Sequence, residues 1–212
     1  ALFGGGDGLL VLVMQEIRLP RALLGLLVGG TLGLSGAALQ GYLRNPLAEP
    51  GLLGVSASAS LGAVLALYSG LSALFALALP LMALCGAMLA VLALTAMAGA
   101  DGRPLTVILA GIAISSLAGA MTSLALNLSP NPFAATEIMF WMLGSLTDRA
   151  MPHVWLMLPF TALGWFLLLR LGRALDALAL GPDAAASMGV DRRQVQRLAV
   201  FGTALSVGAA TA

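Results

Sequence analysis

The sequence predicts an all-α protein, a polytopic bundle of transmembrane helices, and three of its features support this prediction. Of the 212 residues, 60% are apolar and only 9% are charged, whereas an average soluble domain is roughly 25% charged. Uncharged runs long enough for a membrane-spanning helix, about 20 residues, recur along the chain. These runs lack the apolar–polar alternation of transmembrane strands. Intrinsic disorder is excluded, because disordered chains are poor in apolar residues.

The uncharged runs predict six spans, the sixth reaching the end of the chain. The first lies between Arg21 and Arg44, and the second and third lie between Glu49 and Asp101, joined by a hairpin at residues 69–72. The fourth runs from Arg103 to near Asn127, the fifth from Met151 to Leu169, and the sixth from Leu198 onward. The first 21 residues are not expected to form a span, because Asp7, Glu16 and Arg18 interrupt them, and Pro20 is expected to begin a helix. We therefore expect the chain to be a fragment of a longer protein.

The arginines predict how the spans are oriented. All ten basic residues are arginines, and they divide unequally between the two sides. One side has seven, Arg44, Arg103, Arg170, Arg173, Arg192, Arg193 and Arg197, and the other has three, Arg18, Arg21 and Arg149. The positive-inside rule places the seven in the cytoplasm. We expect a multi-pass protein in the bilayer of the cell inner (plasma) membrane.

Small residues recur every four positions along three of the expected spans. On the fourth span they are Gly111, Ser115, Gly119 and Ser123. Such a stripe allows two helices to approach closely. It would also form the smooth wall of a path through the membrane, and the residues alone leave both interpretations open.

Two loops next to the first span have a specific composition. Arg18 and Arg21 lie on its outer side, where they would anchor the helix at lipid head groups or bind carboxylates of an external partner. On the inner side, Pro46 and Pro50 forbid a continuous helix, and Asn45 can satisfy backbone groups in a turn. The segment from Arg44 to Gly51 therefore predicts a rigid, shaped loop.

The long cytoplasmic loop at residues 172–197 predicts two short helices. Pro182 and Asp183 suit the first turn of a helix, and Gly189 suits its end. A second short helix is expected from Arg192 to Arg197, leading into the sixth span. The element would lie either in a groove on another protein or on the membrane surface.

The outer loop from Asn127 to His153 predicts a short interfacial helix, Ala135 to Leu146, because it contains Trp and Phe. His153 has no cysteine or carboxylate at metal-ligand spacing, which favours an interface residue over a metal ligand.

Residues that catalysis, ion coupling or nucleotide binding would need are missing. No Asp, Glu, Lys, Arg or His lies in the interior of an expected span, so no proton relay or ion-coupling site of the usual kind is predicted. Without lysine there is no phosphate-binding loop of the Gly-Lys-Ser/Thr type. The net charge of +1 offers no field for nucleic acid, and the single cysteine, Cys85, excludes a disulfide framework. We expect no catalytic residue, no cofactor and no bound metal.

Several segments together resemble one family, the FecCD-type permeases for iron–siderophore, haem and vitamin B12 uptake, which are membrane subunits of type II ABC importers. The resemblance is strongest from Arg18 to Ala63 and continues through residues 109–111 and 140–145. It ends in Leu180-Gly181, Ala185 and Met188-Gly189-Val190. It implies a ten-helix permease of which the first and last helices are missing here. Residues 1–212 would be one transmembrane permease domain, and residues 172–197 a cytoplasmic coupling loop within it.

The resemblance also implies partners and site residues. A periplasmic substrate-binding protein would dock at Arg18 and Arg21, two cytoplasmic ABC ATPase subunits would bind the coupling loop, and a second permease subunit would complete a homodimer or pseudo-dimer. The implied cytoplasmic gate includes Asn45 and Leu47, and the implied translocation path is Gly111, Ser115, Gly119 and Ser123. The implied coupling residues are Gly181, Ala185, Met188, Gly189, Arg192 and Arg193.

The expected activity is alternating-access import of an iron chelate, a siderophore complex or haem, with vitamin B12 (cobalamin) as the alternative. ATP would be hydrolysed by the partner subunits, so this chain would be a transport subunit and not an enzyme. An ion-coupled secondary transporter is a weaker alternative, because no ionisable site is visible in the spans.

Overall fold

The computed structural model describes residues 8–75, 77–99, 103–129, 132–147 and 149–212, and the regular elements in these ranges are helical. Ten α-helices are described in them: α1 (Gly8–Leu12), α2 (Leu19–Leu43), α3 (Val55–Tyr68), α4 (Ala78–Ala98), α5 (Pro104–Asn127), α6 (Pro132–Leu143), α7 (Met151–Leu169), α8 (Gly172–Ala179), α9 (Pro182–Ser187) and α10 (Arg192–Thr211). A π-helical segment, η1 (Val13–Arg18), and two 3₁₀ turns, η2 (Pro50–Leu53) and η3 (Leu71–Ala73), connect some of them. The prediction of an all-α bundle is confirmed.

The first span begins earlier than the sequence predicts. Helical structure runs without a break from Gly8 to Leu43, so the expectation that the first 21 residues lie outside the span is wrong, although α2 itself begins at Leu19 with Pro20 in its first turn, as predicted. Pro20 has no N–H group and would interrupt the α-helical hydrogen-bond ladder. The chain winds into a π-helix just before it, where the Leu19 N–H donates to the Met14 carbonyl. This wider turn accommodates the proline without ending the helix.

Among the residues that the structure describes, four helical segments are long and apolar enough to cross a membrane: Gly8–Leu43, Ala78–Ala98, Pro104–Asn127 and Met151–Leu169. The last two match the predicted fourth and fifth spans. α3 is also apolar but has only 14 residues. The predicted hairpin between α3 and α4 is present, with Gly70 in the left-handed region at φ +71°.

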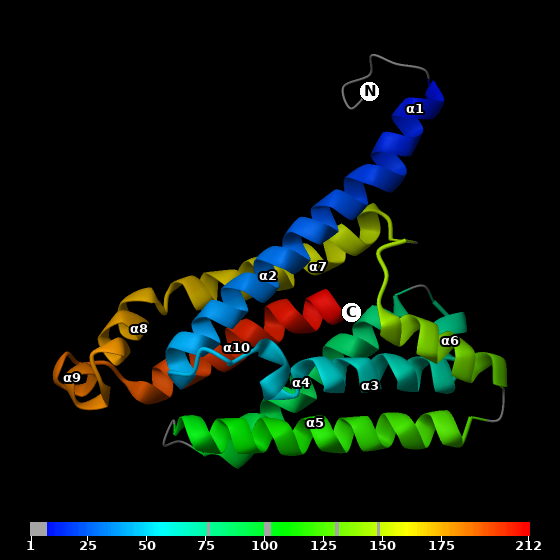
Figure 1. The fold of residues 1–212 in the computed structure, drawn as a ribbon. Coiled ribbons are helices and arrows are strands. Elements are labelled where there is room, and N and C mark those ends of the chain that lie inside the picture. The colour runs from blue at the N-terminus through cyan, green and yellow to red at the C-terminus, as the bar shows by residue number, and fades with distance from the viewer. Residues whose placement is uncertain (1–7, 76, 100–102, 130–131, 148) are drawn as a thin grey trace.

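Small residues bring α3 and α4 into close contact. A Cβ on Gly62 would overlap the carbonyl oxygen of Met82, and one on Gly86 would overlap that of Ser58. Such contact between backbones is the packing expected of small-residue stripes in membrane helices. α5 lies along this pair, on the side away from α2 and α7 (Figure 1).

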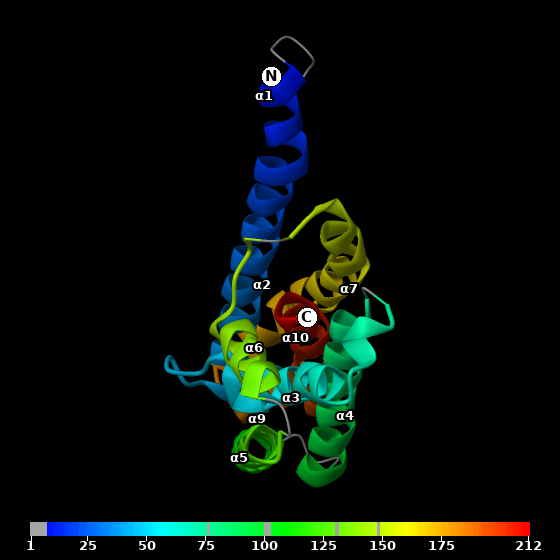
Figure 2. The same cartoon turned by 90° about the vertical axis from the view of Figure 1, so that its right-hand side faces the viewer.

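A second packed group contains α2, α7 and α10 (Figures 1 and 2). At the crossing of α7 and α10, a Cβ on Gly164 would lie 2.7 Å from the Gly202 carbonyl oxygen. The indole Nε1 of Trp165 donates to the Thr31 hydroxyl at 3.0 Å, which joins α7 to α2. α10 also packs on α4 and so connects the two groups.

The segments that connect the long helices lie at the two opposite ends of the bundle. α8 and α9 lie at one end, beside the start of α10, and α6 lies at the other (Figure 1). The interfacial helix is present as α6, which starts and ends three residues earlier than predicted because Pro132 begins it and Gly144, at φ +74°, follows it. The separate short helix expected from Arg192 to Arg197 is instead the beginning of α10.

Candidate functional site

The residues that the resemblance points to lie in four regions and do not form one pocket. Two are at the N-terminal part of α2, two in the loop after α2, four along α5, and the rest in and after α9. Figure 1 places the N-terminal part of α2 far from α8 and α9, with the long axis of α2 between them. This arrangement suits a protein with a different contact at each end better than an enzyme with one active centre.

The two outer arginines have different environments. Arg18 is exposed and its guanidinium approaches the sulfur of Met14 at 3.9 Å. Arg21 is partly buried and donates from Nη2 to the backbone carbonyl of Thr147, in the loop between α6 and α7. Arg21 therefore holds this loop against α2, while Arg18 presents its charge to the surroundings.

The loop from Arg44 to Gly51 has a defined, hydrogen-bonded shape. Arg44 is in the left-handed region at φ 50° and ends α2. The side-chain oxygen of Asn45 accepts a hydrogen bond from the Leu47 N–H at 3.0 Å, which closes a turn of the Asx type. The Gln40 amide donates to the Ala48 carbonyl at 3.4 Å. Leu47, 83% exposed, is held at the tip.

This loop continues into a segment that packs on α5. η2 follows it, and Leu53 at the end of η2 is fully buried. A Cβ on Gly111 would overlap the carbonyl oxygen of Leu52, so the backbones of η2 and α5 touch. Displacement of the loop would therefore also displace the first half of α5.

The small-residue stripe on α5 does not stay on one face. Gly111 is buried against η2, Ser115 is half-buried, and Gly119 and Ser123 are exposed. A spacing of four residues drifts by about 40° per step on a helix of 3.6 residues per turn. The stripe thus turns from a packing contact into an open surface along α5.

Two glycines with positive φ, Gly181 at +118° and Gly189 at +79°, bracket the segment that the resemblance assigns to coupling. Between them, α9 begins with Pro182 and Asp183, as predicted. Ala185 is fully buried, whereas Met188 is 63% exposed and Gly189 is exposed. After the turn, the Asp191 carboxylate caps α10 by accepting from the Arg193 N–H at 2.9 Å.

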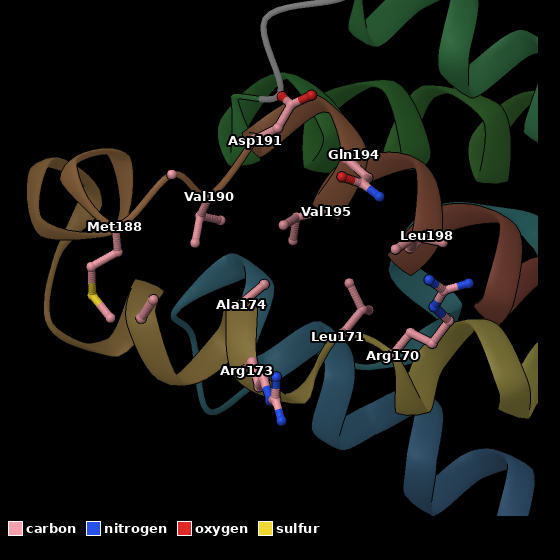
Figure 3. Close-up of a pocket in the computed structure, with 12 residues that line it drawn as sticks. Arg170, Leu171, Arg173, Ala174, Met188, Val190, Asp191, Gln194, Val195 and Leu198 are labelled. Carbon is pink, nitrogen blue, oxygen red and sulfur yellow. The ribbon is translucent and has the colours of Figure 1, made fainter.

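α8 is a helix that the sequence pattern did not predict, and it forms a groove with the start of α10 (Figure 3). The groove has a volume of about 340 Å³, and Leu171 and Ala174 face Val190 and Val195 in it. A recognisable signal was present in the apolar positions 171, 174, 175 and 178, which are spaced as on one helix face. The charges of Arg170, Arg173 and Asp191 lie around this apolar floor.

α8 also contacts the end of α2. The side chain of Leu175 lies against Gly41, where an added Cβ would be 3.3 Å from its Cδ1 atom. Gly41 precedes the Asn45 loop by one helical turn. A chain of direct contacts therefore runs from α8 through α2 and the loop to η2 and α5.

Other candidate chemistry is sparse in the described part of the chain. No group of three His, Cys, Asp or Glu side chains with metal-binding geometry is found in those residues. The His153 ring, in the first turn of α7, accepts at Nδ1 from the Ala150 N–H at 3.3 Å. Cys85 is an exposed thiol on α4.

The fold is that of an ABC transporter permease. A solved structure described as an inward-facing metal-chelate type ABC transporter matches with a TM-score of 0.84 and 29% sequence identity, over 93% of this chain and 63% of the other. The chain belongs to the FecCD transport family, whose model matches residues 1–212. The family resemblance and the location in the inner membrane are thereby confirmed.

Curated relatives include permeases with different substrates. An uncharacterized ABC transporter permease, YvrB of Bacillus subtilis, is 38% identical over 99% of this chain. The ferric enterobactin permease FepD of Escherichia coli is 38% identical over 94%, and the vitamin B12 permease BtuC of Citrobacter koseri 35% over 95%. The chain spans about 60% of the length of these relatives.

Proposed function

We propose that this chain is the membrane-spanning part of a permease subunit of an ABC importer, and that the importer carries an iron chelate, either a siderophore complex or haem. The observation that carries the proposal is the continuous line of contacts from the exposed coupling segment to α5. Two cytoplasmic ABC ATPase subunits would bind Gly181, Ala185, Met188, Gly189, Arg192 and Arg193. They would hydrolyse the ATP, so the chain itself would be a transport subunit.

The contacts suggest how movement of the ATPases would reach the path. A shift of α9 and α8 is transmitted to α2 through Leu175 and Gly41, and then to the hydrogen-bonded loop of Asn45 and Leu47. Because η2 touches Gly111, the loop and α5 move together. Ser115, Gly119 and Ser123 would line the path that alternately opens to either side.

At the outer end, Arg18 would bind a carboxylate of a periplasmic substrate-binding protein. Arg21 would contribute by holding the loop at Thr147 in place beside it. A second permease subunit would enclose the path, in a homodimer or pseudo-dimer, because Gly119 and Ser123 are on an open face of this chain.

Vitamin B12 is the second candidate substrate, because the BtuC relatives are nearly as similar as FepD. A path lined by small, uncharged side chains suits either bulky chelate, and selection would rest with the binding protein. An ion-coupled secondary transporter is disfavoured, because the α4 and α5 sequences have no ionisable side chain that would bind a coupling ion.

The test is uptake by the full-length permease, reconstituted with its ATPase and binding protein in liposomes, of a ferric siderophore, haem or cyanocobalamin. We expect ATP-dependent uptake of one iron chelate; exclusive uptake of cyanocobalamin would select the alternative. Gly189→Trp should abolish uptake while binding-protein docking is unchanged. Gly70→Trp is the matched control, since Gly70 also has a positive φ and open space but lies in the opposite hairpin. Normal uptake by Gly189→Trp would overturn the coupling assignment.

A further inference from the structure

A second pocket, of about 350 Å³, lies between the C-terminal end of α4 and the N-terminal half of α10. It is separate from the groove beside α8. Its lining consists of Thr95, Gly99, Arg193, Gln196, Arg197 and Phe201. Neither the resemblance nor the proposed transport cycle gives Gln196 or Arg197 a role.

The lining residues of α10 are ordered by polarity along the helix. Arg193, Gln196 and Arg197 are spaced i, i+3 and i+4 and so share one face. Phe201 follows Arg197 by one helical turn and lies about 12 Å from Arg193 along the axis of α10. On α4, the apolar Leu92 is 57% exposed, one turn before Thr95 on the same face. The pocket therefore has arginines at one end and Phe201 at the other, and Leu92 of α4 lies outside its lining.

The pocket contains Gln196 in addition to its two exposed arginines. Gln196 is only 5% exposed, and its side chain has no hydrogen-bond partner among the residues that the structure describes. Its amide is not among the fully buried polar groups without a partner, so it is accessible from the pocket that it lines, where it can donate to a ligand oxygen. Two guanidinium groups beside it favour a phosphate oxygen, because their paired N–H donors match its geometry.

We propose that this pocket binds an anionic phospholipid of the cytoplasmic leaflet. The phosphodiester is held by Gln196 and Arg197, with Arg193 at the pocket edge facing the ATPase contact, and an acyl chain runs along Phe201 toward Leu92. With the orientation that the arginines predict, the cationic end is at the level of the cytoplasmic head groups. Basic pockets between transmembrane helices on this side are suited to anionic lipid head groups.

The test uses the full-length permease in detergent, measured by native mass spectrometry and thermal unfolding with phosphatidylglycerol, phosphatidylcholine or inorganic phosphate. We expect retained binding and stabilisation with phosphatidylglycerol. Arg197→Gln should weaken that binding about fivefold, the effect of about 1 kcal/mol per arginine near a membrane surface. Gln196→Leu, which keeps the packing volume, should weaken it about tenfold.

Three results would overturn the proposal. The first is equal binding of phosphatidylcholine, and the second is equal stabilisation by inorganic phosphate, which would indicate a site for a free anion. The third concerns an internal ion pair: Asp101 is the acidic residue nearest in sequence to Gly99 and lies outside the described residues. If Asp101→Asn lowers stability as much as Arg197→Gln does in the absence of lipid, Arg197 forms an ion pair within the protein and does not bind a lipid.

Arg103→Gln is the matched control for charge. Arg103 is exposed on the same side of the protein, before α5, and does not line the pocket. Its loss should leave phosphatidylglycerol binding within twofold of the unmodified permease. A loss as large as that of Arg197→Gln would show general charge attraction and overturn the assignment to this pocket.

Discussion

The carbonyl oxygen of Leu52 lies directly against the Cα of Gly111, with no room for a Cβ between them. This contact joins the loop after α2 to the helix that we propose lines the path. It depends on glycine because a carbonyl in η2 cannot move without moving the buried Leu53 beside it.

Gly111→Ala should therefore lower the thermal stability of the permease. The added methyl group overlaps backbone, and overpacking of this kind costs about 1–3 kcal/mol. Gly119→Ala is the control, because the Cβ position of Gly119 is open and alanine is the better helix former. Thermal unfolding of both variants in the same detergent checks the prediction. Equal stability of the two variants would contradict the packing at Leu52.

The hydrogen bond from Trp165 to Thr31 should stabilise the contact of α7 with α2. Thr31 is fully buried, so removing its hydroxyl in Thr31→Val leaves the Trp165 indole N–H without a partner, at a cost of about 1–3 kcal/mol. A double-mutant cycle with Trp165→Phe, followed by thermal unfolding, should give a coupling energy of about 1 kcal/mol. Additive effects of the two substitutions would show that the bond contributes nothing.

The outer arginines should differ in what their loss affects. Arg18→Glu should weaken docking of the binding protein at least tenfold at low salt, with less effect at high salt, because charge reversal at an exposed site acts through screened electrostatics. The thermal stability of the Arg18→Glu variant should be unchanged. Arg21→Gln should lower stability as well as docking, because it releases the Thr147 loop.

Binding-protein affinity at two ionic strengths and thermal unfolding separate these effects. Arg18→Lys is the conservative control and should keep most of the affinity. If Arg18→Glu binds as tightly as the unmodified permease at low salt, the docking role of Arg18 is wrong.

Asp191 should set the start of α10 and thereby the end of the coupling segment. Asp191→Ala removes the cap on the Arg193 N–H and should destabilise the helix end by about 1 kcal/mol, whereas Asp191→Asn retains a capping oxygen. Hydrogen exchange at residues 192–195 should accelerate in the alanine variant and remain near normal in the asparagine variant. Equal exchange in both would mean that the carboxylate does not cap the helix.

Much of the architecture is local in the chain and was predictable. The ends of α5 and α7 coincide with charged or polar boundaries, because lipid excludes charge and ends a span where charge begins. The turn at Gly70 and the start of α9 at Pro182 follow from backbone preferences of single residues. The helical structure before Pro20 is the exception: Pro20 lies in the first turn of α2 as expected, but a π-helical segment continues the helix on its N-terminal side.

The sequence by itself thus determined the helical class, the fourth and fifth spans and the hairpin between α3 and α4. Tertiary structure decided which side of each element is covered. Gly111 packs while Gly119 is open, although both belong to one stripe, because a four-residue spacing rotates around a helix. Likewise Arg21 meets Thr147 and α8 meets α10 only after folding, since these partners are distant in sequence and no local pattern specifies their contact.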